Sequence, residues 1–201
     1  MNQLSGNDKT PKTARGVKTR DKLLQAAEIE FGDKGFHAAA ISGITYRAGV
    51  ALGTFYTYYQ SKEEIFQDLV SYMSHRTRRW IAERVAGAPD RMAAERLGIE
   101  AYIEFARQHK GIYRIITEAE FVANDAYREH YNSFADAYRD NLEKAGESGD
   151  IRQGDYEIWT WAIMGIAVFL GMKYTEWDDT VPAARIAEIV TDLIANGIRP
   201  R

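Results

Sequence analysis

The segment Ile41–Lys62 restricts the fold more than any other part of this 201-residue chain. Its first half places apolar residues on one helical face and ends at Gly49, where a helix-ending left-handed conformation is easily adopted. A second short helix is predicted over residues 52–58. The next helix is predicted to begin at Ser61 with a capping box, Ser61-Lys62-Glu63-Glu64. Two short helices joined by a tight glycine-containing turn form a helix-turn-helix.

The rest of the chain has helical periodicity and contains no convincing strand. Only four prolines occur, all at predicted boundaries or in the tails. Besides the two short helices and the helix that begins at Ser61 and ends near Gly87, we predict helices over residues 19–34, 90–109, 112–122, 125–145, 155–177 and 183–196. The predicted fold class is all-α, with an N-terminal three-helix domain followed by a larger helical domain.

The charges are unevenly distributed. The net charge is −3, which argues against a protein that binds nucleic acid through charge alone. Residues 1–22, however, contain six basic and two acidic side chains, so the N-terminal end is positive. Residues 1–15 are polar and lack periodicity, and we interpret them as a flexible basic arm or a solvated tail.

Cysteine is absent, which excludes disulfides, thiolate metal sites and cysteine nucleophiles. The N-terminus lacks the apolar region of a signal peptide, and the longest apolar stretch, Ile158–Met172, is too short to span a bilayer. We therefore expect a cytoplasmic protein with no membrane partner.

The outward face of the second short helix has an unusual composition. A solvated helix normally presents Lys, Glu and Gln, whereas this face presents small, hydroxylated and aromatic residues: Leu52, Gly53, Thr54, Tyr56, Thr57 and Tyr58. Such side chains suit close approach to a DNA groove and hydrogen bonds to phosphates. Half-buried core aromatics are the ordinary alternative for the two tyrosines.

The segment Thr19–Val70 resembles the DNA-binding domain of the TetR/AcrR family. The matching phrases are Phe31 to Phe36 at the end of the first helix, Ala48-Gly49-Val50 in the turn, and the run Gly53-Thr54-Phe55-Tyr56-Thr57-Tyr58-Tyr59-Gln60-Ser61-Lys62-Glu63. The match covers about a quarter of the chain without a gap. It implies a transcriptional regulator that is not an enzyme, most simply a ligand-responsive repressor that binds a palindromic operator in double-stranded DNA as a homodimer.

The resemblance assigns roles to individual positions. Tyr56, Tyr58, Thr54 and Lys62 match family positions that bind or approach the DNA backbone. The positions that match DNA-facing or base-facing family residues are Ser42, Leu52, Gly53 and Thr57. By the same resemblance, residues 16–62 form the DNA-binding domain, and residues 63–201 form the ligand-binding and dimerisation domain.

Some positions depart from the family pattern. Ala40 and Ala51 stand where a capping Thr or Ser is frequent, and Gly43 lies inside a helix, where it should cost about 1 kcal/mol relative to Ala. Leu52 offers no hydrogen bond where many relatives have Lys or Gln. These departures affect the expected operator sequence and leave DNA binding itself intact.

The C-terminal two-thirds is interpreted from its pattern together with the resemblance. The last two long helices are expected to pair across a two-fold axis, and the predicted dimer interface comprises Trp161, Gly165, Phe169, Ile186, Val190 and Leu193. The aromatic middle helices are expected to enclose a pocket for a small-molecule effector, with Tyr102, Phe105, Tyr113, Phe121, Phe134 and Trp161 as its candidate residues. A plain helical core is the alternative for any one of these aromatics.

The sequence gives little support to two other functions, an enzyme and a DNA-packaging protein. An enzyme has little support, because the four histidines are scattered and no Glu-x-x-His pair, phosphate-binding glycine loop or hydrolase motif occurs. We predict no catalytic residue, metal site or cofactor. A sequence-indifferent DNA-packaging protein conflicts with the negative net charge.

Overall fold

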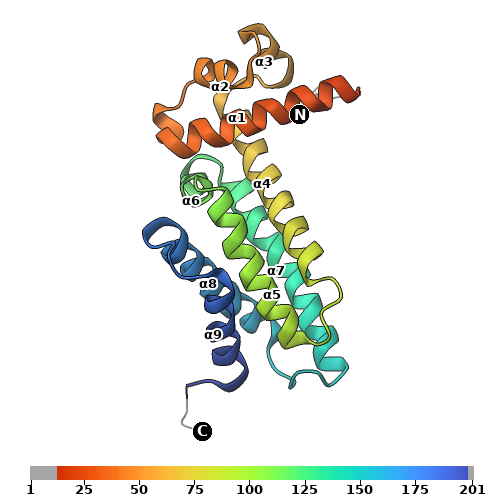
Figure 1. Ribbon diagram of the computed structural model, residues 1–201. Helices are drawn as coiled ribbons and strands as arrows, with labels where there is room; N and C mark the ends of the chain where they lie inside the picture. Colours follow the sequence, from red (N-terminus) through yellow and green to blue (C-terminus); the bar gives the residue numbers. More distant parts are fainter. Residues whose placement is uncertain (1–12, 199–201) are drawn as a thin grey trace.

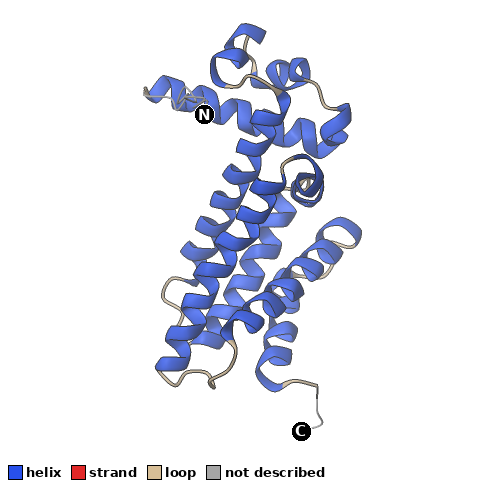
Figure 2. Ribbon diagram, turned by 180° about the vertical axis from the view of Figure 1, so that it is seen from behind, coloured by secondary structure: helices blue, strands red, loops and turns tan. Residues whose placement is uncertain are grey.

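The computed structural model describes residues 13–198, and every regular element among them is helical. Figures 1 and 2 show three N-terminal helices stacked across one end of a bundle formed by the others. The elements are α1 (Ala14–Ala38), α2 (Ile41–Ala48), α3 (Leu52–Tyr58), α4 (Lys62–Val85), α5 (Arg91–Gln108), α6 (Ile112–Val122), α7 (Asn124–Glu147), α8 (Tyr156–Met172), the π-helical turn η1 (Lys173–Trp177) and α9 (Ala183–Asn196). The all-α prediction is confirmed.

Helix α1 begins five residues earlier than the sequence predicted. Thr13 caps it, since its Oγ1 accepts a hydrogen bond of 3.1 Å from the Gly16 amide. Thr19, the predicted cap, lies within the helix, where its hydroxyl donates to the Arg15 carbonyl at 3.0 Å. Of the predicted flexible arm, residues 1–12 lie outside the described residues, and its last two residues begin α1.

The end of α1 is fastened to α6. Gly35 has φ of 76° and ψ of 166°, a non-helical conformation that kinks the helix, and the chain continues for one more turn beyond the kink. The backbone amide of Phe36 donates to Glu118 Oε2 at 2.6 Å. Gly32 and Gly111 bring the two backbones together so closely that a Cβ on Gly32 would lie 2.9 Å from the Gly111 Cα. Helices α1 and α6 therefore form one rigid contact.

One apolar core extends from the N-terminal helices into the bundle. Leu23 and Phe31 from α1 and Phe55 from α3 are fully buried, and they belong to the same cluster as Met73 from α4 and Ile115 from α6. Phe66 contacts Phe31 edge-on, with ring centroids 5.0 Å apart. The core thus continues across residue 62, the predicted boundary between the two domains.

Helix α2 is held against α1 by a buried carboxylate. Glu30 is only 1% exposed, and it accepts hydrogen bonds from Lys34 at 2.6 Å and from Arg47 at 2.9 Å. Burial opposes ionisation, yet the hydrogen bonds from these two cations hold the pKa of Glu30 below its ordinary value. Gly43 allows this arrangement, because a Cβ there would overlap the Glu30 carboxylate. Gly43 lowers the helix propensity of α2, but packing against Glu30 leaves no room for a larger residue.

We predict that Gly43→Ala destabilises the protein by about 1–3 kcal/mol, because overpacking against a paired, buried carboxylate outweighs the gain in helix propensity. Gly53→Ala is the matched control, since a Cβ at Gly53 meets no atom within 4 Å. It should be neutral or stabilising by up to about 1 kcal/mol. Urea unfolding measures both. A Gly43→Ala protein as stable as Gly53→Ala would contradict the packing argument.

The far side of the bundle has a second, smaller core. Helix α9 packs on α5, and its inner face buries Ile186, Ala187 and Val190 against Ile99 and Ile103. Within residues 13–198, one helical stretch, Tyr156–Trp177, is long and apolar enough to cross a membrane, because the helix extends beyond the apolar residues 158–172 that the sequence analysis considered too short. In this stretch, 17% of the most apolar window is buried inside the chain.

Candidate DNA-binding surface and effector cavity

Helix α3 presents the predicted recognition face to solvent. Ser42, Leu52, Gly53, Tyr56 and Thr57 are exposed, with Leu52 at 51%. Thr54, Tyr58 and Lys62 are half-buried at the edge of this face. All eight predicted DNA-binding residues belong to α2, α3 and the first turn of α4. Helices α2 and α3 lie at the free end of the molecule, at the top of Figure 1.

Helix α3 is held in place by its buried residue Phe55, which packs in the core, and by hydrogen bonds just beyond its C-terminal end. Both α2 and α3 begin without a side-chain cap, as expected from Ala40 and Ala51. Beyond α3, the Tyr59 hydroxyl donates to Asp68 at 2.5 Å, and Arg20 binds both oxygens of that carboxylate at 2.6 and 2.7 Å. Burial and the hydrogen bond to Asp68 raise the pKa of Tyr59, which stays protonated. This network ties α3 to α1 and α4.

The predicted capping box at the start of α4 forms with one difference: the Glu64 carboxylate bonds the amide of Gln60, one residue before the cap, in place of an amide in the first turn. The Ser61 hydroxyl accepts from the Glu64 amide at 3.1 Å, and the Glu64 carboxylate accepts from the Gln60 amide. The direction of α4 is thereby fixed where the chain leaves the helix-turn-helix.

Lys62 has structural bonds in addition to its predicted phosphate role. Its Nζ donates to the carbonyls of Phe36 at 2.7 Å, His37 at 3.3 Å and Ala39 at 3.0 Å, at the C-terminal end of α1. A cation at the C-terminus of a helix complements the helix dipole. Lys62 thus joins α1 to α4 in the unbound protein, and a phosphate contact would have to share this amine.

We predict that Lys62→Met lowers the free energy of unfolding by about 1–2 kcal/mol, because charge-assisted bonds to three carbonyls are lost. If the amine also binds phosphate, the slope of log affinity for DNA against log salt concentration falls by about 1. Unfolding and anisotropy titrations measure the two effects separately. Unchanged stability would contradict the structural bond, and an unchanged slope would remove Lys62 from the DNA interface.

Sequence reasoning missed one exposed aromatic on this surface. Tyr46 lies on α2 and is 88% exposed, far more than is usual for a tyrosine. Its neighbour Arg47 is held by Glu30 and Asp33 and points to the α1 side. The signal was available in the sequence, because Tyr46 falls off the apolar stripe of α2.

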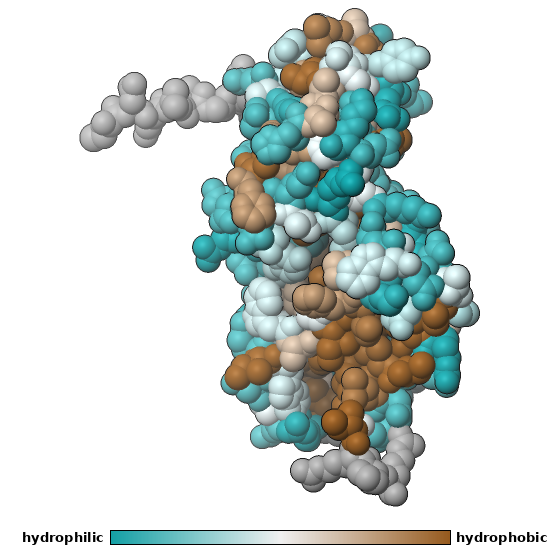
Figure 3. Space-filling view, turned by 90° about the vertical axis from the view of Figure 1, so that its left-hand side faces the viewer, coloured by the Kyte–Doolittle hydropathy of each residue, from teal (hydrophilic) through white to brown (hydrophobic). Residues whose placement is uncertain are grey.

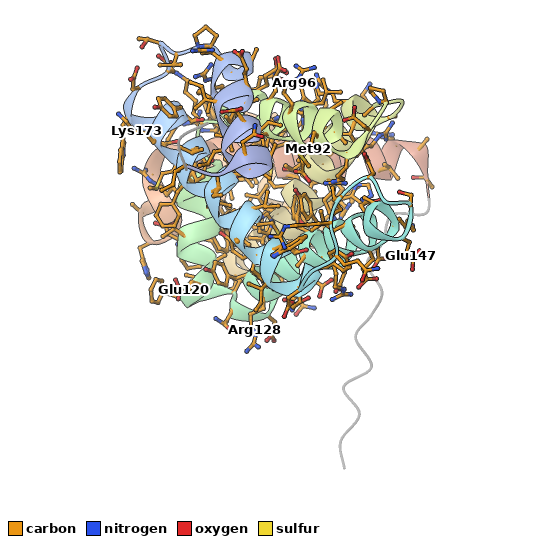
Figure 4. The ribbon with its side chains drawn as sticks, turned by 90° about the horizontal axis from the view of Figure 1, so that it is seen from below. Met92, Arg96, Glu120, Arg128, Glu147 and Lys173 are labelled. Carbon is orange, nitrogen blue, oxygen red and sulfur yellow. The ribbon has the colours of Figure 1, made fainter. Side chains whose placement is uncertain are left out.

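The bundle contains a partly open cavity of about 520 Å³ between α4, α5, α7 and α8. Its walls are mostly aliphatic and aromatic, which is typical of a small-molecule site. In the view along the bundle in Figure 4, the labelled charged side chains Arg96, Arg128, Glu147 and Lys173 lie around the outside. The cavity wall is thus more apolar than the surface around the bundle, although it includes the charged residues Arg78, Arg79, Arg91 and Glu95.

The six predicted pocket residues lie in different environments. Tyr102 and Phe134 line the cavity. Tyr113 donates a 3.2 Å hydrogen bond to Tyr102 from beyond the wall. Phe105 belongs instead to the large core, and Phe121 is 83% exposed on α6.

The sequence could not distinguish these environments, because α5 and α6 are apolar on faces that meet different neighbours. Trp161 also lies outside the cavity lining. It is an exposed residue of α8 whose indole N–H donates to Glu157 at 2.8 Å.

One end of the cavity holds a neutralised polar cluster. Glu95 is 2% exposed and pairs with Arg91 through one oxygen, while the Tyr138 hydroxyl donates to the other. Burial raises the pKa of Tyr138, so this hydroxyl keeps its proton. The only acidic side chain that lines the cavity in the described structure therefore has both oxygens occupied.

The predicted dimer residues also divide. Trp161 and Phe169 are exposed on α8, Leu193 is 40% exposed on α9, and Gly165 faces open space. Ile186 and Val190 are instead buried against α5 within the same chain. The sequence assigned them to the interface because an amphipathic helix has one stripe, and that stripe is used internally here.

The outer face of α8 and α9 is strongly apolar. Figure 3 shows a broad hydrophobic area on the lower half of the molecule, on the side where these helices lie. We call it the α8/α9 face and define it by its exposed apolar residues: Ile158, Trp161, Phe169, Ile189 and Leu193. Contiguous apolar surface of this kind marks an interaction site.

Comparison with known proteins supports the same interpretation. Residues 23–69 match the family model described as bacterial regulatory proteins, tetR family. The HTH-type transcriptional regulator YdgC of Bacillus subtilis is 28% identical over 193 residues, which cover 94% of this chain and 96% of that protein.

Solved structures share the whole architecture. FadR of B. subtilis, determined in complex with stearoyl-CoA, superimposes with a TM-score of 0.77 at 22% identity, over 89% of this chain and 99% of that one. The fatty acid degradation regulator FadR of Bacillus halodurans gives 0.78 at 21% identity, over the same shares. The helix-turn-helix of this chain thus matches the tetR family of bacterial regulatory proteins, its full length is similar to an HTH-type transcriptional regulator, and its fold is that of solved regulators of this kind: it is a DNA-binding transcriptional regulator of the TetR type.

Proposed function

We propose that the chain is a cytoplasmic repressor that binds a palindromic operator as a homodimer and releases it when a small molecule occupies the cavity. The observation that carries the proposal is the exposed α3 face, held rigidly on a core that continues into the cavity-bearing bundle. Leu52 would contact a base edge through an apolar group such as a thymine methyl, while Tyr56 and Thr57 offer hydroxyls to the backbone or bases.

The effector is proposed to be largely apolar. The cavity volume of about 520 Å³ lies within the usual range for small-molecule sites, and its aliphatic lining favours a hydrocarbon portion. The stearoyl-CoA of the B. subtilis FadR structure supports this class of ligand. The effector acts by preferring one dimer geometry over another, and no turnover is proposed.

The α8/α9 face is proposed to bury itself against a second copy. An apolar surface open on this scale is unfavourable in water, and pairing of α8 and α9 across a two-fold axis covers both copies at once. Gly165 has no neighbour within 4 Å in the protomer, so a partner helix can approach closely there. The same pairing accounts for the apolar length of Tyr156–Trp177 in a DNA-binding protein.

We predict that Ile189→Glu gives a folded monomer, because this side chain is 53% exposed on the α8/α9 face. Val190→Glu is the matched control one residue along α9. There the carboxylate would enter the intramolecular core, since Val190 is 5% exposed, and the protomer should lose several kcal/mol of stability. Sedimentation and circular dichroism measure assembly and folding. An intact Ile189→Glu dimer would move the interface elsewhere.

We predict that selection from a random duplex library recovers a palindromic consensus, bound at least a thousandfold more tightly than random DNA at physiological salt. Half-sites should lie about 34–36 Å apart or a multiple of that spacing. Anisotropy at two salt concentrations measures the specificity. A folded dimer with equal affinity for all sequences would contradict operator recognition and favour a packaging role.

A further inference from the structure

The cavity contains one cation that no protein group neutralises. Arg78 comes from α4 and lines the cavity, and its Nε is buried without a hydrogen-bond partner. Among residues 13–198, its guanidinium forms no ion pair, and its closest described interaction is with the Phe134 ring, 6.0 Å from the centroid. The side chain is half-buried, and its Nε is enclosed without a partner. A cation that is partly removed from water without a counter-charge is unfavourable, which points to a ligand that supplies one.

A second unpartnered polar atom lies on the adjoining wall, which α7 forms beside α4. His130 comes from α7, and its Nδ1 is buried without a hydrogen-bond partner. Burial and the charge of Arg78 lower the pKa of His130 to about 4, so the ring is neutral and can donate one N–H. Arg78 and His130 line the same cavity, and Phe134, which the Arg78 guanidinium overlies, is on the same helix as His130.

The other charged groups of the cavity wall are already satisfied. Arg91 is paired with Glu95, and Arg79 is paired with Glu83 at 2.8 Å, with its side chain 74% exposed. Glu95 has no oxygen free for Arg78, because Arg91 and Tyr138 occupy both. The balance of charge inside the cavity is therefore positive, and it is centred on Arg78.

We propose that Arg78 and His130 form the anion-recognition site of the cavity, and that its ligand is an amphipathic carboxylate. The head group would accept hydrogen bonds from the Arg78 guanidinium and the His130 ring, and the hydrocarbon body would lie among Ile81, Val85, Ile99, Ile163 and Val168. This inference rests on the proposed effector cavity and specifies its ligand class.

The carboxylate form is favoured over its coenzyme A thioester by the same geometry. A guanidinium fork matches the two oxygens of a carboxylate, whereas a thioester carbonyl at the same place is neutral and offers one oxygen. A cationic head would meet the like charge of Arg78. The site therefore selects both the sign of the charge and its position at the end of the ligand.

The test is calorimetric titration of the full-length protein, without DNA, with straight-chain carboxylates from octanoate to hexadecanoate. The alcohol, the trimethylammonium compound and the coenzyme A thioester of the best chain length are titrated in parallel. Arg78→Met removes the charge and keeps most of the stem. Arg79→Met is the matched control, since it removes the same charge from the neighbouring position, where the guanidinium is exposed and paired.

We expect a carboxylate to bind at least tenfold more tightly than the other three head groups, and Arg78→Met to abolish that preference while Arg79→Met keeps it. Arg78→Met should also raise the melting temperature of the ligand-free protein, whereas loss of a merely structural arginine would lower it. Equal binding of carboxylate and alcohol, no carboxylate binding, or tighter binding of the thioester would overturn the proposal. Operator affinity of the same variants, measured separately, tests the proposed function: intact operator binding with no carboxylate preference defeats only this inference.

Discussion

Helix α4 belongs to both halves of the molecule, and the rest of the structure depends on that sharing. Its first turn is capped by Ser61 and fastened to α1 through Lys62, its middle buries Phe66 and Met73 in the common core, and its last turns line the cavity through Arg78. A helix is stiff over this length, so a displacement at the cavity end reaches the helix-turn-helix.

Helix α6 limits how that displacement can be absorbed. The close approach of Gly32 and Gly111, the Glu118 bond to the Phe36 amide and two bonds from Arg114 to the carbonyls of Gly32 and Asp33 hold α1 to the bundle. Under the proposed function, we therefore expect the three N-terminal helices to move as one body with α4 and α6, so that α3 is reoriented without being unfolded. A ligand changes DNA affinity only to the extent that it prefers one of the resulting dimer geometries.

The sequence predicted the fold class, the helix-turn-helix and most helix bounds, because these follow from periodicity, glycine stops and the Ser61 capping box. It missed the early start of α1, because two threonines could serve as caps and only tertiary packing shows which one does. Ile186 and Val190 were placed on the wrong side of α9, since one apolar stripe cannot reveal whether its partner is in the same chain. Arg78 could not be recognised from the sequence either. Whether a charged side chain has a partner depends on which residues surround it in the folded protein.

If the proposed function is right, occupancy of the cavity changes the separation of the two recognition helices in the dimer, and a single distance tests this. The chain contains no cysteine, so Gln60→Cys, at an exposed position just before α4, gives one spin label per protomer. Pulsed electron–electron double resonance on the dimer then measures the distance between the two labels, once with operator bound and once with the tightest-binding carboxylate bound. We expect one narrow distribution with operator and a displaced one with carboxylate. Release of operator by the carboxylate with no change in this distance would contradict the account.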